Sequence, residues 1–82
     1  NPLSSSTVLH YVLDEPSVLS LTIYDVIGQP VFHAPQSVLS RGHHSLTWDG
    51  RDDAGRNLPS GIYFMRSVVG GDAAVTRIAV VR

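Results

Sequence analysis

The sequence predicts an all-β sandwich of about seven short antiparallel strands. Apolar and polar residues alternate with a two-residue period in several segments, which is the pattern of half-buried strands. Turn signals built from Gly, Pro, Asn and Asp separate these segments at fairly regular spacing. No segment of any length shows the helical period, so strands are expected throughout.

Three strands are expected in the first half of the chain. They cover Thr7 to Leu13, Val18 to Ile27 and Val31 to Ala34. Pro35 is expected to end the third strand, at a sheet edge or where the chain changes sheets, and residues 36–41 to form a connection. Gly28 is expected to adopt a positive φ in the turn before that strand. The inward-facing residues of the first two strands would be Leu9, Tyr11, Leu13, Leu19, Leu21 and Ile23.

The stretch from His43 to Met65 organises the second half of the chain. It reads as a strand, a long polar turn and another strand. Trp48, the only Trp, ends the first of these strands, and Tyr63 lies near the start of the second. Such a pair could pin two facing sheets together. Tyr63 and Met65 are expected to face inward, with Phe64 and Arg66 on the outer face.

A final hairpin completes the expected fold. Gly70-Gly71-Asp72 supplies its turn, and the last strand runs from Ala73 to Val81. Two interpretations of the outer apolar side chains of this strand stay open: they pack on a neighbouring element, or they mark a strand that a partner pairs with. The expected inward residues are Thr76, Ile78 and Val80, and the outer ones are Val75, Arg77, Ala79 and Val81.

This pattern of strands indicates an immunoglobulin-like sandwich, without the Cys–Trp–Cys spacing of antibody domains. We expect a single domain over residues 1–82, in which residues 1–6 are the end of a linker. The opening residues carry no secretory signal peptide, which suggests a module of a longer protein.

The composition argues against several classes of function. The net charge is −1 and no basic stripe occurs, so nucleic acid is not an expected partner. No apolar run approaches the roughly 20 residues of a membrane-spanning helix, so the chain is not expected to be transmembrane. The chain has no Cys, and therefore neither disulfides nor thiolate metal sites.

The four His residues offer no spacing suited to a metal. His43 and His44 are adjacent and would point to opposite faces of a strand, while His10 and His33 belong to other strands. We expect structural or surface roles for them, with His44 half-buried beside Trp48.

The acidic cluster Asp49, Asp52 and Asp53 lacks the spacing and the final Glu of a calcium loop. These side chains are expected to accept hydrogen bonds from loop amides two residues further on.

No catalytic constellation is evident, so neither an enzyme nor a cofactor is expected. There is no G-x-S-x-G nucleophile elbow and no phosphate-cradling glycine loop. Sugar binding would need a row of exposed aromatic side chains. The outward candidates Tyr24, Phe32 and Phe64 lie on different strands.

An ordered set of motifs over the whole chain resembles the type A C-terminal sorting domain of the bacterial type IX secretion system, an immunoglobulin-like domain related to that of the flagellar hook-capping protein. The matching stretches are Asn1–Leu3, Leu21–Val31, Gly42–Gly50, Asp53–Arg56, Leu58–Phe64 and Thr76–Arg82. The positions that carry the motif are Tyr24, Asp25, Gly28, Trp48, Asp49, Gly50, Gly55, Pro59, Gly61 and Tyr63. The family often has Lys where Arg77 or Ile78 stands, and a larger apolar residue at Ser67, which suggests a shallower core or a shifted register near the last hairpin.

This resemblance implies a role in trafficking. Cargo with such a domain reaches the periplasm through an N-terminal signal. An outer-membrane translocon then recognises the domain, and a sortase-like protease commonly removes it as the cargo, often a hydrolase, reaches the cell surface or the medium. The candidate strand for recognition by the translocon consists of Thr76, Arg77, Ile78, Ala79, Val80, Val81 and Arg82. The alternatives are a structural module of a flagellar hook-capping protein and an accessory module of a secreted glycoside hydrolase.

Overall fold

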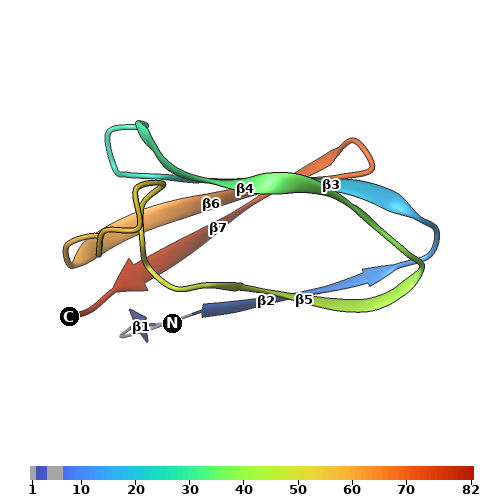
Figure 1. Ribbon diagram of the computed structural model, residues 1–82, viewed down its shortest axis with the longest axis horizontal. Coiled ribbons are helices and arrows are strands. Elements are labelled where there is room, and N and C mark those ends of the chain that lie inside the picture. Colours follow the sequence, from blue (N-terminus) through green and yellow to red (C-terminus); the bar gives the residue numbers. More distant parts are fainter. Residues whose placement is uncertain (1, 4–6) are drawn as a thin grey trace.

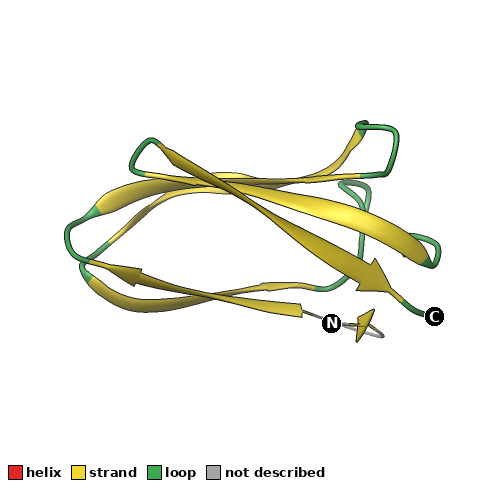
Figure 2. Cartoon of the chain, turned by 180° about the vertical axis from the view of Figure 1, so that it is seen from behind, coloured by secondary structure: helices red, strands yellow, loops and turns green. Residues whose placement is uncertain are grey.

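The computed structural model describes residues 2–3 and 7–82, with side chains from residue 8 onward. This part of the chain folds as an all-β sandwich of two facing sheets, as predicted (Figure 1). The larger sheet has the strand order β1-β7-β6-β3-β4, and the smaller sheet pairs β2 with β5. The strands are β1 Pro2–Leu3, β2 Thr7–Leu13, β3 Ser17–Tyr24, β4 Pro30–Leu39, β5 Gly42–Trp48, β6 Gly61–Val69 and β7 Asp72–Val80. Figure 2, seen from behind, shows only strands and loops over these residues.

One strand pair of the described chain departs from the predicted antiparallel arrangement. β1 pairs with β7 in parallel, with Pro2 opposite Ala79 and Leu3 opposite Val80. Pro2–Leu3 fall in the range predicted to be the end of a linker, whose other residues (1 and 4–6) lie outside the described part. The four pairs that the other strands form among themselves are antiparallel.

The predicted alternation of side chains is confirmed on the strands that build the core. On β3, Leu19, Leu21 and Ile23 are buried, and Ile23 is completely inaccessible to solvent. On β6, Tyr63 and Met65 are buried as predicted. β2 turns Leu9, Tyr11 and Leu13 towards the larger sheet, where they are half-buried. Trp48, Leu58, Ile78 and Val80 complete the core between the sheets.

The last hairpin has the register expected for a two-residue turn. Gly70 and Gly71 both have positive φ (57° and 89°), as a type I′ turn requires of both its central residues. The pairing of β6 with β7 runs without a shift from Gly61 opposite Val80 to Val69 opposite Asp72. Ser67 is buried within this unshifted pair, so the small side chain does not alter the register.

The fourth strand is longer than predicted. The sequence suggested that a strand over residues 31–34 stops at Pro35, but β4 continues to Leu39 through residues predicted to be a connection. The pairing between β3 and β4 shifts here, because Leu19 faces Ser37 whereas Leu21 faces Ala34. Proline is tolerated at a bulge of an edge strand, and β4 is such an edge. The predicted edge position of Pro35 is therefore right, and the predicted end of the strand is wrong.

The turn after β3 begins earlier than predicted. The strand ends at Tyr24 rather than Ile27, because the Asp25 side chain accepts hydrogen bonds from the backbone N–H groups of Ile27 and Gln29 at 3.1 and 2.9 Å. Gly28 has a φ of 85°, which confirms its predicted conformation. A side chain at Gly28 would meet no neighbouring atom within 4 Å, so conformation rather than space favours glycine there.

Two side chains lie in environments that differ from the prediction. Thr76 shares the inner face of β7 with Ile78 and Val80 but is exposed, because a two-stranded sheet cannot cover the whole inner face of a larger one. Phe32 was grouped with outward-facing aromatics, yet it packs against the core with its ring centroid 6.4 Å from that of Trp48. It pairs across the sheet with the buried Ile23, which places it on the inner face.

We expect the core to depend strongly on Ile23. Ile23→Ala should lower the free energy of unfolding by about 2–5 kcal/mol, because it removes buried methylene groups and leaves a cavity, and Ile23→Val by about 0.5–1.5 kcal/mol. Urea denaturation measures both changes. Val26→Ala is the control, since Val26 is 67% exposed, and a loss at Val26 as large as that at Ile23 would contradict the assigned core.

Candidate functional site

The loop of residues 49–60 is held to the sandwich by two aromatic side chains from facing sheets. Trp48 ends β5 and Tyr63 lies in β6, with ring centroids 6.1 Å apart and planes inclined by 64°. The Trp48 indole N–H donates to the Arg51 carbonyl oxygen (3.1 Å), and the Tyr63 hydroxyl donates to the Pro59 carbonyl oxygen (2.7 Å). The predicted pair that pins the two sheets is thus present, and its polar atoms also shape the loop.

The last residue of the chain is bound to the same loop. The Arg82 guanidinium donates to the carbonyl oxygens of Gly50 (2.6 Å) and Leu58 (2.5 Å), and its backbone N–H donates to Ser60 Oγ (2.9 Å). Gly50 also accepts the Leu58 N–H, so the guanidinium reinforces a contact that closes the loop. Burial raises the pKa of Tyr63, the Asp25 carboxylate raises it further, and the nearby Arg82 opposes this rise.

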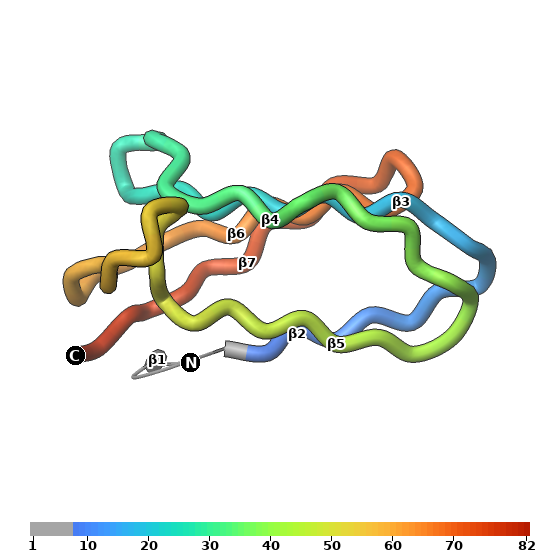
Figure 3. Tube along the Cα trace, in the orientation of Figure 1, coloured from blue at the N-terminus to red at the C-terminus, as the bar shows by residue number. Residues whose placement is uncertain are grey.

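Asp53 ties the loop to the edge of β4. Its carboxylate accepts the backbone N–H of His33 (2.8 Å) and contacts His33 Nδ1 (2.7 Å), while its own N–H donates to the Val31 carbonyl oxygen (3.1 Å). Figure 3 shows the chain after β5 rising to the level of β4. The hydrogen bonds from His33 lower the pKa of the Asp53 carboxyl. No local sequence pattern signals this contact, because it joins residues 20 positions apart.

The other two acidic residues of the cluster stay within the loop. Asp52 Oδ1 accepts the backbone N–H groups of Ala54 (3.0 Å) and Arg56 (2.9 Å), and the first of these is the predicted bond to an amide two residues on. Asp49 is exposed and lies 3.5 Å from the Arg51 guanidinium. The predicted bond is thus present for Asp52, whereas Asp49 contacts Arg51 and Asp53 contacts His33 instead, so the three carboxylates do not converge.

The His residues are spread over the two sheets. His10 and His43 are exposed on the outer face of the smaller sheet. His44 is half-buried as predicted, but it lies opposite Tyr11 and not beside Trp48. Its Nε2 donates to the Ser40 carbonyl oxygen (2.7 Å). Within the described chain, no three His, Asp or Glu side chains are grouped so that they could hold a metal ion. That part also has no helix of the length and apolarity needed to cross a membrane.

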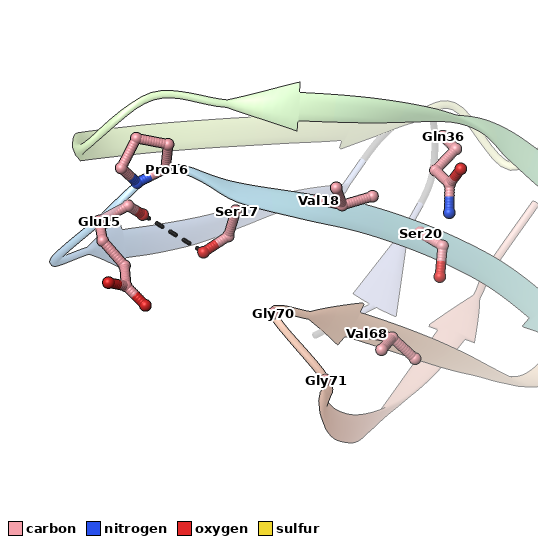
Figure 4. A pocket seen from close by; sticks show the side chains of 9 residues that line it. All are labelled: Glu15, Pro16, Ser17, Val18, Ser20, Gln36, Val68, Gly70 and Gly71. Atoms are coloured by element: carbon pink, nitrogen blue, oxygen red, sulfur yellow. Dashed lines mark hydrogen bonds between the residues drawn. The ribbon is translucent and has the colours of Figure 1, made fainter.

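Two hollows in the surface differ in character. One of about 400 Å³ lies beside the turns at residues 14–16 and 70–71, where Ser17 Oγ donates to the Glu15 carbonyl oxygen (3.2 Å) (Figure 4). Glu15 is the one ionisable side chain among its described lining residues. The other, of about 230 Å³, opens between β4 and β5 and is mainly apolar, with Phe32, Leu46 and Met65 in its wall. Neither contains an acid–base pair.

The motif positions gather mainly where the chain turns and where the sheets meet. Gly55 has positive φ (81°), and its carbonyl oxygen accepts a bond from Arg51, while Gly61 begins β6. Tyr24 alone among the motif aromatics lies on the outer face of the larger sheet. Most of these residues therefore form turns or connect the loop of residues 49–60 to the two sheets.

The candidate recognition strand contains both buried and exposed residues. Ile78 and Val80 belong to the core, and Arg82 is engaged with the loop. Thr76, Arg77 and Val81 are exposed, and Ala79 is half-buried. A partner that meets the folded domain can therefore contact only part of this strand.

The chain is similar to one protein family and to several solved structures. The family model of the FlgD Ig-like domain matches residues 4–69. No curated protein matches the chain.

Three solved structures share the fold. Dimeric latent PorU from Porphyromonas gingivalis is similar with a TM-score of 0.79 and 22% identity, over 99% of this chain and 8% of PorU. FlgD from P. aeruginosa gives a TM-score of 0.63 and 22% identity, over 90% of this chain and 62% of FlgD. PorZ, an essential bacterial surface component of the type IX secretion system of P. gingivalis, gives 0.55 and 20%, over 92% of this chain and 11% of PorZ. The chain thus matches less than two thirds of each of these proteins.

The contact between Asp53 and His33 should make stability depend on acid pH. Because the native pKa of Asp53 is below its ordinary value of 3.8, its contribution is present above that value and is lost as pH falls through the native pKa. Thermal unfolding of the wild type and Asp53→Asn should differ most near neutral pH and converge at the acid end. Asp49→Asn is the control, and a constant difference between wild type and Asp53→Asn at all pH values would contradict the assignment.

Arg82 should stabilise the loop measurably. Arg82→Ala removes charged hydrogen bonds from two carbonyl oxygens, so the free energy of unfolding should fall by about 1.5–3 kcal/mol. The Leu58 amide, which donates to Gly50, should also exchange faster with solvent. Arg56→Ala is the matched control, because the Arg56 side chain is 80% exposed. Equal amide exchange in wild type and Arg82→Ala would show that the guanidinium does not hold the loop.

Proposed function

The chain belongs to the FlgD Ig-like domain family, and on that premise we propose that it is a sorting domain for type IX secretion. In this role it directs a cargo domain of the same polypeptide, often a hydrolase, from the periplasm across the outer membrane to the cell surface or the medium. Its partners are the outer-membrane translocon and a sortase-like protease, and the domain itself catalyses no reaction.

The observation that carries this proposal is the extent of the likeness to PorU. The likeness covers 99% of this chain and only 8% of the PorU chain, so this chain corresponds to one module of a much larger protein. PorZ, a surface component of the type IX system, contains a similar module. The resemblance of the motif positions Trp48, Gly50, Pro59 and Tyr63 to those of the sorting-domain family also supports the proposal.

A folded sorting domain must present a recognisable surface without unfolding. The C-terminal strand suits this requirement, because its inner residues are fixed in the core while Arg77 and Val81 face solvent. The edge of that strand is less accessible, since β1 already pairs with Ala79 and Val80. We therefore favour recognition of side chains over complete strand addition.

A structural role in a flagellar hook-capping protein is the second candidate. It is favoured by the likeness to FlgD from P. aeruginosa, with which the chain shares a TM-score of 0.63. The third candidate is a role as an accessory module of a secreted glycoside hydrolase.

A secretion assay with folded variants tests the proposal. A reporter with an N-terminal export signal is fused ahead of residues 1–82 in a bacterium that has the type IX machinery and in its translocon-deficient mutant. We expect the reporter at the surface or in the medium of the first strain and in the periplasm of the second. The Ig-like domain of FlgD in the same position is the matched control and should leave the reporter in the periplasm.

Deleting residues 76–82 would be a poor test, because it also removes Ile78 and Val80 from the core. Retention of the intact, folded fusion in the periplasm of the competent strain would refute the sorting function and favour the structural role.

A further inference from the structure

The outer surface of strands β6 and β7 combines apolar side chains with two exposed arginines. Tyr63, Met65, Ile78 and Val80 point into the core, so the alternate residues of both strands face away from it. Cross-strand pairs place Ile62 beside Ala79, Phe64 beside Arg77 and Arg66 beside Val75. We call these six residues the arginine face. In Figure 1, β6 and β7 belong to the upper of the two sheets.

We propose that the arginine face is the docking surface for an acidic protein segment that also carries apolar side chains. This inference rests on the proposed sorting function and names the surface that its partner recognises.

The apolar part of the arginine face is accessible. Val75 is 64% exposed, and Phe64 and Ile62 are half-buried. Tyr24 of β3 lies directly opposite Phe64, so the row Tyr24, Phe64 and Arg77 crosses three adjacent strands. Exposed apolar residues signal an interaction site when they are contiguous, and these are neighbours through strand pairing.

The charge of the arginine face is not compensated within the described chain. Asp49 and Asp52 form ion pairs with Arg51 and Arg56, whereas no described carboxylate lies within 4.0 Å of Arg66 or Arg77. Residues 17–24, 61–69 and 73–81 contain no Asp or Glu, although the whole chain has a net charge of −1. The acidic residues lie in turns or at strand ends, so Arg66 and Arg77 share this sheet surface with no carboxylate.

This combination favours an acidic protein over other ligands. Two arginines give too little positive charge for nucleic acid, which needs a basic patch or stripe. A second copy placed face to face would bring the like charges of Arg66 and Arg77 together, which is unfavourable. Arginine with aromatic side chains is the composition enriched in protein interfaces, where a complementary acidic partner fixes orientation and accelerates association.

The strand edges of the larger sheet are poorer docking sites than the arginine face. Pro30 and Pro35 remove N–H donors from β4, and Asp53 occupies the Val31 carbonyl and the His33 N–H. At the other edge of the larger sheet, β1 covers Ala79 and Val80 of β7. A partner that recognises the folded larger sheet therefore meets side chains more readily than unpaired backbone groups.

The test compares two double variants in the secretion assay. Arg66→Glu with Arg77→Glu reverses both charges of the arginine face. Arg41→Glu with Arg56→Glu makes the same change in net charge at exposed positions elsewhere. Thermal unfolding of the purified domains confirms that both are folded. We expect the control variant to be exported like the wild type, and export of the first variant to fall at least about tenfold, the factor for 1.4 kcal/mol of binding.

The outcomes separate this inference from the function on which it rests. If the wild type is exported and the folded charge-reversed variant is exported equally well, the arginine face is not the docking surface, although the sorting function stands. If the wild type is not exported, the sorting function is refuted. A direct binding measurement then determines whether the arginine face binds an acidic segment.

That measurement is a nuclear magnetic resonance titration of the isotopically labelled domain with a synthetic heptapeptide of alternating glutamate and phenylalanine. Backbone shifts should concentrate at Phe64, Arg66 and Arg77, weaken between about 20 and 500 mM salt as charges are screened, and vanish in the charge-reversed variant. Shifts elsewhere, or none, would overturn the proposal. A wild-type dimer that the charge reversal dissociates would also overturn it, by assigning the arginine face to a second copy.

Discussion

The contact between Trp48 and Tyr63 is the interaction on which the rest of the structure depends. A pair of strands such as β2 and β5 is not stable by itself in water, so the smaller sheet must be attached to the larger one through its side chains. Trp48 provides the largest apolar surface for this attachment, and its ring meets both Tyr63 and Phe32. Because both interior aromatics also donate hydrogen bonds to the loop, the core and the loop form as one unit.

Much of this fold was predictable because strand periodicity reports burial directly. The alternation Leu19, Leu21, Ile23 identified the inner face of β3, and the Gly70–Gly71 pair identified the last turn. These signals are local, since each depends on the backbone geometry of a few neighbouring residues. Turn chemistry is local in the same sense, and it predicted the bond that Asp52 accepts from the Ala54 amide.

The features that sequence could not give depend on distant contacts. β4 continues past Pro35 only because the shifted pairing with β3 places the proline at a bulge on an edge. The hydrogen bonds between Asp53 and His33 and between Arg82 and Gly50 join residues 20 and 32 positions apart, which no local pattern encodes. The arginine face is another such case, because strand order alone brings Tyr24, Phe64 and Arg77 into one row.

The protected edge of β4 has a consequence for the behaviour of this domain at high concentration. An open sheet edge is a template on which further chains add, which leads to fibrils and aggregates. Two prolines and the Asp53 contact withdraw hydrogen-bonding groups from β4, the edge that is longest among the described strands. We therefore expect the β4 edge to contribute little to aggregation, even where the domain is highly concentrated.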